Sequence, residues 1–340
     1  MPEMDGLELI EKIRQSATEY YQYIILLTSK SEKEDIIEGM ELGADDFLSK
    51  PFDRDELRVR VRAGFRIIDL EHSLVNKNAE ITAANDRMKS DLDAAARLQS
   101  SLLPSELPEI ADTNFAWLHQ PCDELAGDIL NVFQLDQDHI GFYVADVSGH
   151  GVPAALLSIS INQAMTPVGT SSLLLETDDT GARVVSPAEV AYELNRQFQM
   201  SKLDRLYFTL AYGVLNTKSL ELDYITAGHP PILLSSTAGE IKPLPGKNLA
   251  IGWFPEAEFE SENVQLHRGD RIYLYSDGIT ETMSPEIAQF GDQRFMELII
   301  KNKAITLQEG IEDLSQAIAD WRKPAKPRDD ISLLAVDTCK

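Results

Sequence analysis

The chain has 340 residues, with 31 Lys and Arg against 56 Asp and Glu, so its formal net charge at pH 7 is −25. The length suggests about two domains, and the apolar content of 43% is enough for packed cores and excludes global disorder. The negative charge argues against sequence-independent binding to nucleic acid or to an anionic membrane surface, because both depend on Lys and Arg.

Other features of the composition point to the cytoplasm. The longest apolar runs are too short to span a membrane, and the first residues lack the basic-then-apolar order of a signal peptide. The two cysteines, Cys122 and Cys339, form no CxxC pair. This excludes a disulfide scaffold and a Cys-based zinc site, and it suits a reducing cytosol. We therefore expect a cytoplasmic protein with no membrane partner.

Residues 1–64 alternate between helical and strand patterns. The expected elements, in chain order, are helix 7–13, strand 23–27, helix 34–42, strand 47–48 and helix 55–66. The central strand pattern is a continuous apolar run, which is typical of a strand buried on both faces. This order is that of βαβ units without their beginning, so we expect a partial flavodoxin-like domain over 1–64.

Residues 65–105 are predicted to form a helical linker, because Gly and Pro are absent between Gly64 and Pro104. Alternating steps of three and four residues pick out a seam of mainly apolar positions: Ile67, Leu70, Leu74, Lys77, Ile81, Ala84, Met88, Asp91, Ala95, Leu98 and Leu102. This period favours a coiled-coil homodimer through 65–103. A solvated amphipathic helix without a partner is the alternative. Lys77 and Asp91 would weaken the seam or fix its register.

Residues 106–340 are predicted to form a larger α/β domain. The strand candidates are 114–119, 129–135, 140–146, 207–215, 221–226, 232–235, 272–275 and 331–336. The helix candidates are 153–165, 187–199, 294–301 and 307–320, and 170–183 has the composition of a loop. Strands here mostly follow strands, which indicates sheets packed on each other with helices outside.

Four aspartates stand out among the acidic residues, because each lies next to an apolar strand. Asp146 and Asp277 end strand patterns, whereas Asp128 and Asp329 precede them. Any one of them alone more often marks a turn. Together at the strand ends of one sandwich they would repel one another unless cations lay between them. Ligands that are all oxygen select Mg²⁺ or Mn²⁺, and two such ions can activate a water and clamp a phosphoryl group.

Five ordered motifs carry a family resemblance: 127–128 (Gly-Asp), 146–151 (Asp-Val-Ser-Gly-His-Gly), 227–231 (Ala-Gly-His-Pro-Pro), 276–278 (Ser-Asp-Gly) and 329–332 (Asp-Asp-Ile-Ser). With them, residues 95–338 resemble the bacterial metal-dependent serine/threonine phosphatases of the PPM family, in the stage II sporulation E and sigma-regulator branch. Residues 94–99 and 102–104 resemble the helix that enters the domain in that branch.

The resemblance implies an α-β-β-α sandwich with two Mn²⁺ or Mg²⁺ ions at one end of the sheets. By the same resemblance, Asp146 bridges both ions and Asp277 and Asp329 hold one of them. Asp128 and the backbone carbonyl of Val147 serve the other ion, partly through water. Asp146 and Asp277 are thereby the catalytic aspartates, and a bridging hydroxide attacks phosphoserine in line without a covalent enzyme intermediate.

The sequence departs from the family pattern at Asn131, where the branch usually has a second aspartate. This puts a supporting role of that position in doubt, and no basic phosphate-binding residue is identified. His150 and His229 lie in motif turns and could act as general acids, but a structural role in the turn is the favoured interpretation.

The first residues also carry a resemblance. Residues 1–9, 27–29, 43–48 and 50–52 resemble the second half of a two-component receiver domain. By resemblance, Thr28 is the phosphate-sensing hydroxyl, Phe47 the switch aromatic and Lys50 the cation on the acyl phosphate. The phosphoacceptor aspartate would lie upstream of Met1, so we expect a fragment or a gene model begun at an internal Met. A remnant kept for dimerisation or docking is the alternative.

The leading hypothesis is therefore a phosphoprotein phosphatase that acts as the output of a two-component, partner-switching system. By resemblance, a sensor histidine kinase acts on the complete receiver, and the substrate is a phosphoserine on a small anti-sigma-factor antagonist-like protein. The alternative is a non-enzymatic response-regulator adaptor that binds a sigma factor or anti-sigma partner. That reading is disfavoured because all four aspartates are present. A DNA-binding regulator is disfavoured by the charge and by the lack of a helix-turn-helix after residue 64.

Overall fold

The computed structural model describes residues 4–16, 21–29, 33–104, 113–167, 172–178, 181–202 and 205–338. The chain divides into two units, Met1–Ser90 and Asp91–Lys340, and each is described here by itself. Across the described ranges, no helix is both long enough and apolar enough to cross a membrane.

The first unit has two parallel strands with helices before, between and after them. Its elements are α1 (Gly6–Gln15), β1 (Ile25–Thr28), α2 (Lys33–Glu41), β2 (Asp46–Ser49) and the start of α3 (Arg54–Ser100). The side chain of Asp5 accepts hydrogen bonds from the backbone N–H groups of Leu7 and Glu8, both at 2.9 Å, and so caps α1. Ile10, Ala44 and Leu48 are its buried apolar residues. The predicted alternation of helix and strand is confirmed.

Helix α3 is continuous from Arg54 to Ser100, so the helices expected over 55–66 and 65–103 are one element. Gly64 does not interrupt it, and a Cβ at this position would lie only 2.6 Å from the ring of Tyr23. The apolar seam positions are left open to solvent in the single chain: the exposed fractions are 69% for Leu70, 57% for Ile81 and 59% for Met88. That exposure is expected both for one chain of the predicted coiled coil and for the solvated helix that is its alternative.

The second unit holds two antiparallel five-stranded sheets. One has the order β11-β10-β13-β14-β3, and the other has the order β12-β9-β8-β5-β4. The strands are β3 (Thr113–Gln120), β4 (Ile129–Gln134), β5 (His139–Val147), β8 (Phe208–Asn216), β9 (Glu221–Ala227), β10 (Ile232–Ser235), β11 (Ile241–Leu244), β12 (Glu262–Gln265), β13 (Arg271–Tyr275) and β14 (Ile331–Thr338).

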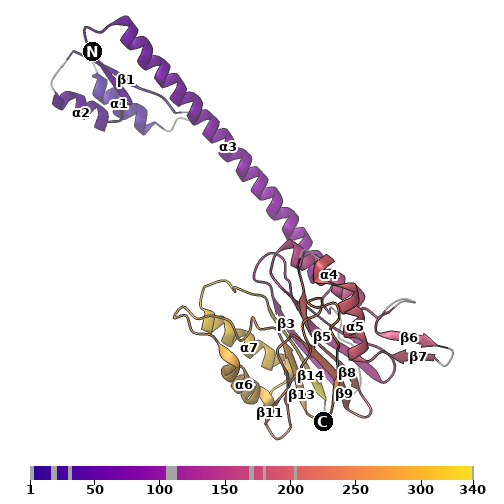
Figure 1. Ribbon diagram of the computed structural model, residues 1–340. Coiled ribbons are helices and arrows are strands. Elements are labelled where there is room, and N and C mark those ends of the chain that lie inside the picture. The colour runs from indigo at the N-terminus through magenta and orange to yellow at the C-terminus, as the bar shows by residue number, and fades with distance from the viewer. Residues whose placement is uncertain are drawn as a thin grey trace. The chain divides into compact units, whose positions relative to one another are not determined.

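Helices cover the outer face of each sheet (Figure 1). On one side, α4 (Val152–Ala164) packs on β4 and β5, and α5 (Pro187–Gln197) packs on β8 and β9. On the other side, α7 (Leu307–Arg322) packs on β3 and β14 and also contacts α6 (Gly291–Lys301). Two short 3₁₀ helices, η1 (Met200–Lys202) and η2 (Asn302–Ala304), complete the unit. This is the predicted α-β-β-α sandwich.

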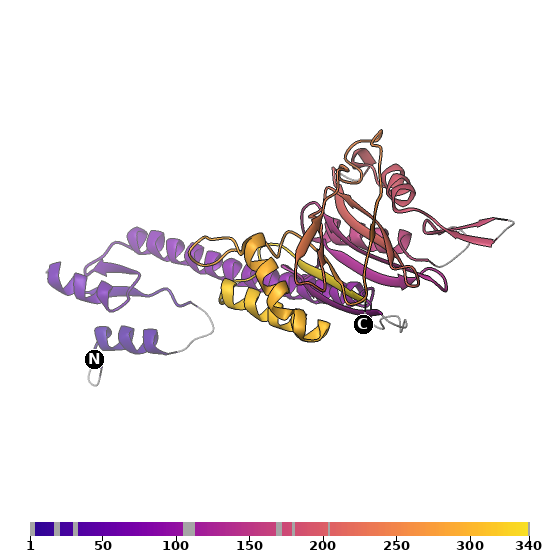
Figure 2. The ribbon, with the colours of Figure 1, turned by 90° about the horizontal axis from the view of Figure 1, so that it is seen from below.

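The expectation of a loop over 170–183 is wrong for its described part. Strands β6 (Leu175–Asp178) and β7 (Gly181–Val184) form an antiparallel hairpin that projects from the sandwich (Figure 2). Arg183 on β7 pairs with Glu176 on β6 at 2.7 Å. The hairpin escaped prediction because its strands are short and polar and show no alternation of apolar residues. The edge strands β11 and β12 were missed for the same reason.

Candidate metal centre

The four aspartates identified from the sequence come from four separate segments of the second unit. Asp146 is the last residue but one of β5, and Asp128 directly precedes β4. Asp277 follows β13, and Asp329 precedes β14. Among them, Asp146 is the carboxylate whose pKa responds to the charges of Asp277 and Asp329 and which also interacts with Asp128.

Asp146 is the group on which the other charges converge. Burial and then the negative charges of Asp277 and Asp329 together raise its pKa to about 7, while a hydrogen bond with Asp128 acts in the opposite direction. Its backbone lies near the end of β5, where Asp146 pairs with Thr209 of β8. The carboxylate is therefore presented by a rigid strand.

Asp128 is the most deeply buried of the four, with an exposed fraction of 2%. Burial raises its pKa well above the usual range, and the charges of Asp146 and Asp330 add to this, while hydroxyls of Ser332 and Ser276 favour the ionised form. Its Oδ2 atom is buried and has no hydrogen-bond partner among the described residues. A buried carboxylate oxygen without a partner is costly, and a cation would relieve the cost.

The pKa values of Asp277 and Asp329 are also raised, although both residues are more exposed than Asp128. Burial raises the pKa of Asp277, and the charge of Glu281 adds to it. Burial also raises the pKa of Asp329, where Asp277 and Asp330 contribute like charge. Both carboxylates therefore face a negative surrounding that favours cations.

Asp330 is a residue that the sequence analysis did not assign. It is 4% exposed, and its Oδ1 accepts a hydrogen bond from the backbone N–H of Cys122 at 2.7 Å. Its Oδ2 accepts hydrogen bonds from the N–H groups of Gly127 at 2.6 Å and Asp128 at 3.3 Å. Asp330 therefore holds the loop that carries Asp128. The doubled aspartate before β14 was the only sequence signal for it.

Gly127 and Gly278 allow the backbone segments beside the aspartates to pack closely. A Cβ on Gly127 would lie 3.2 Å from the carbonyl oxygens of both Val147 and Gly149. A Cβ on Gly278 would lie 2.0 Å from the carbonyl oxygen of Asp330. These motif glycines are needed for close packing of the backbone beside the aspartates.

The donor set fits divalent cations, although the described residues include no group of three or more His, Cys, Asp or Glu side chains already gathered at metal-binding distance. The orphaned oxygen of Asp128 and the mutual repulsion of the carboxylates are the two observations that support the fit. Because every candidate ligand is oxygen, the set suits Mg²⁺ or Mn²⁺.

Asn131 does not extend this cluster. Its side chain donates to Asn162 of α4 at 3.1 Å, and the hydroxyl of Tyr143 donates to the same Asn162 oxygen at 2.8 Å. Asn131 thus takes part in the contact between β4, β5 and α4.

The two histidines of the motifs lie in different surroundings. His229 is half-buried, and its Nδ1 lies 2.6 Å from Oγ1 of Thr209. Burial lowers its pKa to about 3, so its ring is neutral at ordinary pH, which agrees with a structural role. His150 is exposed and lies 3.5 Å from a carboxylate oxygen of Asp123.

Thr28 and Lys50 lie at the carboxyl ends of β1 and β2, whereas Phe47 lies within β2. Thr28 pairs with Ser49, and the backbone N–H of Lys50 donates to the carbonyl of Thr28 at 2.7 Å. Phe47 lies on β2 with the guanidinium of Arg60 5.8 Å from its ring centre. Lys50 is exposed at the end of β2.

Comparison with solved structures agrees with this architecture. The fold is similar to that of the SiaA-PP2C domain of Pseudomonas aeruginosa, with a TM-score of 0.60 and 24% sequence identity over 74% of this chain and 98% of that one. The second unit therefore has a PP2C-like fold. The chain belongs to the stage II sporulation protein E (SpoIIE) family, whose model matches residues 136–338, and a response regulator receiver domain model matches residues 1–62. The PPM phosphatases, which include this family, depend on metal ions.

Two curated relatives from Bacillus subtilis (strain 168) are similar in sequence. The phosphoserine phosphatase RsbU is 27% identical over 224 residues, which are 66% of this chain and 61% of RsbU. The phosphoserine phosphatase RsbP is 29% identical over 198 residues, which are 57% of this chain and 46% of RsbP. The chain therefore spans about half of the length of these relatives.

Proposed function

We propose that this chain is a metal-dependent protein serine/threonine phosphatase that serves as the output of a two-component, partner-switching system. The observation that carries the proposal is the buried Oδ2 of Asp128, which has no hydrogen-bond partner among the described residues and lies beside the half-buried carboxylate of Asp146. Membership of the SpoIIE family and similarity to two phosphoserine phosphatases support the same activity.

In this proposal, two Mn²⁺ or Mg²⁺ ions would be held by Asp146 together with Asp277 and Asp329 on one side and with Asp128 and the carbonyl of Val147 on the other. Such ions supply positive charge to a phosphoryl group and lower the pKa of a bound water. The protein's own part is to fix its ligands on strand ends and to exclude solvent from the inner side of the site.

The proposed substrate is a phosphoserine or phosphothreonine on a small protein similar to an anti-sigma-factor antagonist. A sensor histidine kinase is the proposed partner of the receiver domain. Both assignments rest on the family of the two domains and on the relatives. Thr28, Phe47 and Lys50 are the receiver residues proposed to respond to phosphorylation.

Helix α3 contacts the loop that carries the proposed ligand Asp128, and we propose that regulation acts through this contact. Gln99, near its end, is buried and forms a pair of hydrogen bonds with the backbone of Ala126: Nε2 donates to the carbonyl at 2.7 Å, and Oε1 accepts from the N–H at 3.0 Å. Ala126 lies two residues before Asp128. A change in how α3 packs in a dimer would therefore reach a ligand loop directly, as in a two-state switch.

The test is hydrolysis of para-nitrophenyl phosphate by the purified 340-residue chain, with Mn²⁺ and with EDTA. Asp146→Ala and Asp277→Ala should each abolish the Mn²⁺-dependent turnover. Asp223→Ala, which removes an exposed carboxylate on β9, is the matched control and should retain it. Absence of Mn²⁺-dependent turnover in the wild type would refute the enzymatic proposal, and binding of a sigma-factor partner by Asp146→Ala would then favour the adaptor.

A further inference from the structure

A basic segment lies directly before the proposed ligand Asp329. Residues 322–328 read Arg-Lys-Pro-Ala-Lys-Pro-Arg, which places four cations in seven positions of a chain whose net charge is −25. The segment connects α7 to β14. Such a local reversal of charge in an acidic protein marks a place where an anion is attracted.

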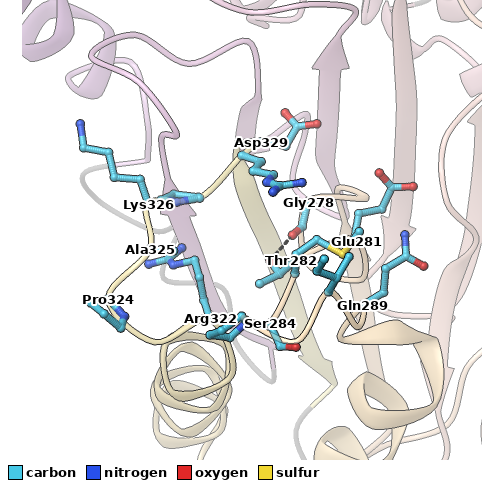
Figure 3. Close-up of a pocket in the computed structure, with 15 residues that line it drawn as sticks. Gly278, Glu281, Thr282, Ser284, Gln289, Arg322, Pro324, Ala325, Lys326 and Asp329 are labelled. Carbon is cyan, nitrogen blue, oxygen red and sulfur yellow. Dashed lines mark hydrogen bonds between the residues drawn. The ribbon is translucent and has the colours of Figure 1, made fainter.

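This segment forms one wall of a cavity of about 420 Å³ (Figure 3). The opposite wall is the loop that follows β13, including Glu281 and Thr282, and the cavity is also bordered by Gly278 and Asp329. Because Gly278 follows Asp277, the cavity adjoins two of the proposed metal ligands. Its volume is within the range of pockets that take small ligands and side chains.

Arg322 is the inner cation of this cavity. Its Nε and Nη1 atoms are buried and have no hydrogen-bond partner in the described part of the chain. In contrast, the buried guanidinium of Arg271 is fully engaged: Nε donates to Asp337 at 2.9 Å, and the terminal nitrogens donate to the carbonyls of Asn302 and Ile305. Two buried guanidinium nitrogens without hydrogen-bond partners are costly, so an anionic ligand would relieve the cost at Arg322.

The neighbouring cations have different surroundings. Lys323 pairs with Glu286 at 3.2 Å and does not line the cavity. Lys326 and Arg328 are exposed and line it, and in Figure 3 the Lys326 side chain extends away from the loop that follows β13. The lining therefore includes three cations and the two carboxylates of Glu281 and Asp329.

We propose that this cavity is an oxyanion subsite of the phosphatase, with Arg322 as its inner cation and Lys326 and Arg328 at its rim. Its ligand is an oxyanion of the substrate protein, either the phosphoryl group that is removed or an acidic side chain beside the phosphoserine. The inference rests on the proposed phosphatase function and adds that the substrate protein is bound through an oxyanion beside the proposed metal site.

The experiment compares the variants Arg322→Gln and Lys326→Gln with Lys323→Gln as the matched control from the same segment. Substrates are para-nitrophenyl phosphate, a phosphoserine peptide with Asp and Glu beside the phosphoserine, and the same peptide with Asn and Gln there. Kinetics are measured with Mn²⁺, and binding of the labelled acidic peptide is measured in EDTA by fluorescence anisotropy.

Loss of a charge-assisted hydrogen bond should raise KM for the acidic peptide by about tenfold in Arg322→Gln. Loss of an exposed charge should raise it by about twofold to fivefold in Lys326→Gln, with kcat less affected. An equal rise with para-nitrophenyl phosphate would identify the ligand as the scissile phosphoryl group. A rise only with the acidic peptide would identify a flanking carboxylate.

The proposal is overturned if both variants have the same KM values and the same peptide affinity as Lys323→Gln. The EDTA measurement separates this result from failure of the phosphatase proposal. If the wild type hydrolyses none of the substrates, the phosphatase proposal fails. The subsite is then still judged by whether Lys326→Gln binds the acidic peptide more weakly than Lys323→Gln.

Discussion

The carboxylate of Asp330 binds the backbone N–H of Gly127 at 2.6 Å, and this contact joins two segments that lie far apart in the sequence. Gly127 precedes Asp128, and Asp330 follows Asp329. One buried hydrogen bond therefore fixes the spacing between aspartates that we assign to two different metal ions.

Replacement of Asp330 should loosen the site without removing a proposed ligand. Asp330→Ala leaves the N–H groups of Cys122, Gly127 and Asp128 without their acceptor, and we expect a loss of about 2–4 kcal/mol in the free energy of unfolding. Relief of repulsion at Asp128 offsets part of this loss. The expected fall in Tm is roughly 5–10 °C in EDTA, and Mn²⁺ affinity should fall about tenfold or more.

Calorimetry on Asp330→Ala and Asp330→Asn checks this expectation. Asn keeps one acceptor oxygen, so it should lie between Ala and the wild type. Asp223→Ala again serves as the control for loss of an exposed carboxylate. An unchanged Tm and an unchanged Mn²⁺ affinity in Asp330→Ala would contradict the role given to this residue.

Replacement of Asp146 by Asn should raise the stability of the metal-free protein and weaken metal binding. In EDTA, Asp146→Asn should melt at a higher temperature than the wild type, because the repulsion among Asp128, Asp146 and Asp277 is reduced. Saturating Mn²⁺ should raise the Tm of the wild type, since a ligand at about 100 times its Kd stabilises by about 2.7 kcal/mol. Saturating Mn²⁺ should change the Tm of Asp146→Asn only slightly.

Thermal melts of both proteins at one pH, with EDTA and with Mn²⁺, test both expectations. If Asp146→Asn melted below the wild type in EDTA, the carboxylate would be a stabilising hydrogen-bond partner instead of a group that awaits a cation. If Mn²⁺ stabilised the variant as strongly as the wild type, Asp146 would not be a bridging ligand.

Gln99 offers a test of the coupling between α3 and the ligand loop. Gln99→Ala removes both hydrogen bonds to Ala126 and leaves the N–H and carbonyl of Ala126 without this partner. We expect kcat for para-nitrophenyl phosphate to change by about tenfold while the exposed neighbour variant Arg97→Ala remains close to the wild type. Gln99→Glu retains one acceptor and should be intermediate. Equal kcat in all four proteins would show that the helix end does not act on the loop.

The sequence was informative where a residue's role depends on its own segment. Asp146 and Asp277 could be identified because each ends an apolar strand and a glycine follows soon after. The order of strands and helices indicated packed sheets with helices outside for a similar reason, since hydrophobic periodicity reports the buried face of each element, whereas the α-β-β-α sandwich itself was implied by the family resemblance.

The role of Asp330 could not be predicted from its own segment, because its partners Cys122 and Gly127 lie about 200 positions earlier and become neighbours only when β14 pairs with β3. Arg322 has the same difficulty: whether a cation is engaged, like Arg271, or left without partners depends on tertiary contacts. The polar β6–β7 hairpin lacked any apolar alternation to reveal it.

The low pKa of His229 predicts how the stability of the protein changes with pH. Its pKa is lowered to about 3 by burial, so the folded state binds a proton less readily than the unfolded state, whose His has a pKa of about 6.5. Stability from this residue is fully present above that value and is lost as the pH falls toward 3. Between pH 6.5 and 5 the loss is at most about 2 kcal/mol.

His229→Gln should therefore lose less stability than the wild type on going from pH 7.5 to pH 5. The measurement is the difference in Tm between the two pH values for each protein, and His267→Gln, at an exposed position, is the control. The expected gain for His229→Gln is roughly 4–8 °C in this difference. An identical pH dependence in all three proteins would mean that His229 becomes protonated without cost to the fold.

The exposed seam of α3 predicts a dimer whose interface can be broken on one face of the helix. Leu74 and Ile81 lie on the seam and are 55% and 57% exposed in the single chain, whereas the neighbouring Val75 is 54% exposed and lies off the seam. Because charges at seam positions disfavour coiled-coil pairing, Leu74→Glu combined with Ile81→Glu should convert the dimer to a monomer. Val75→Glu adds a charge at equal exposure and should leave the dimer intact. Light scattering coupled to size-exclusion chromatography measures the mass of each protein, and a monomeric wild type, or a dimer that survives the double change, would favour the solvated linker helix.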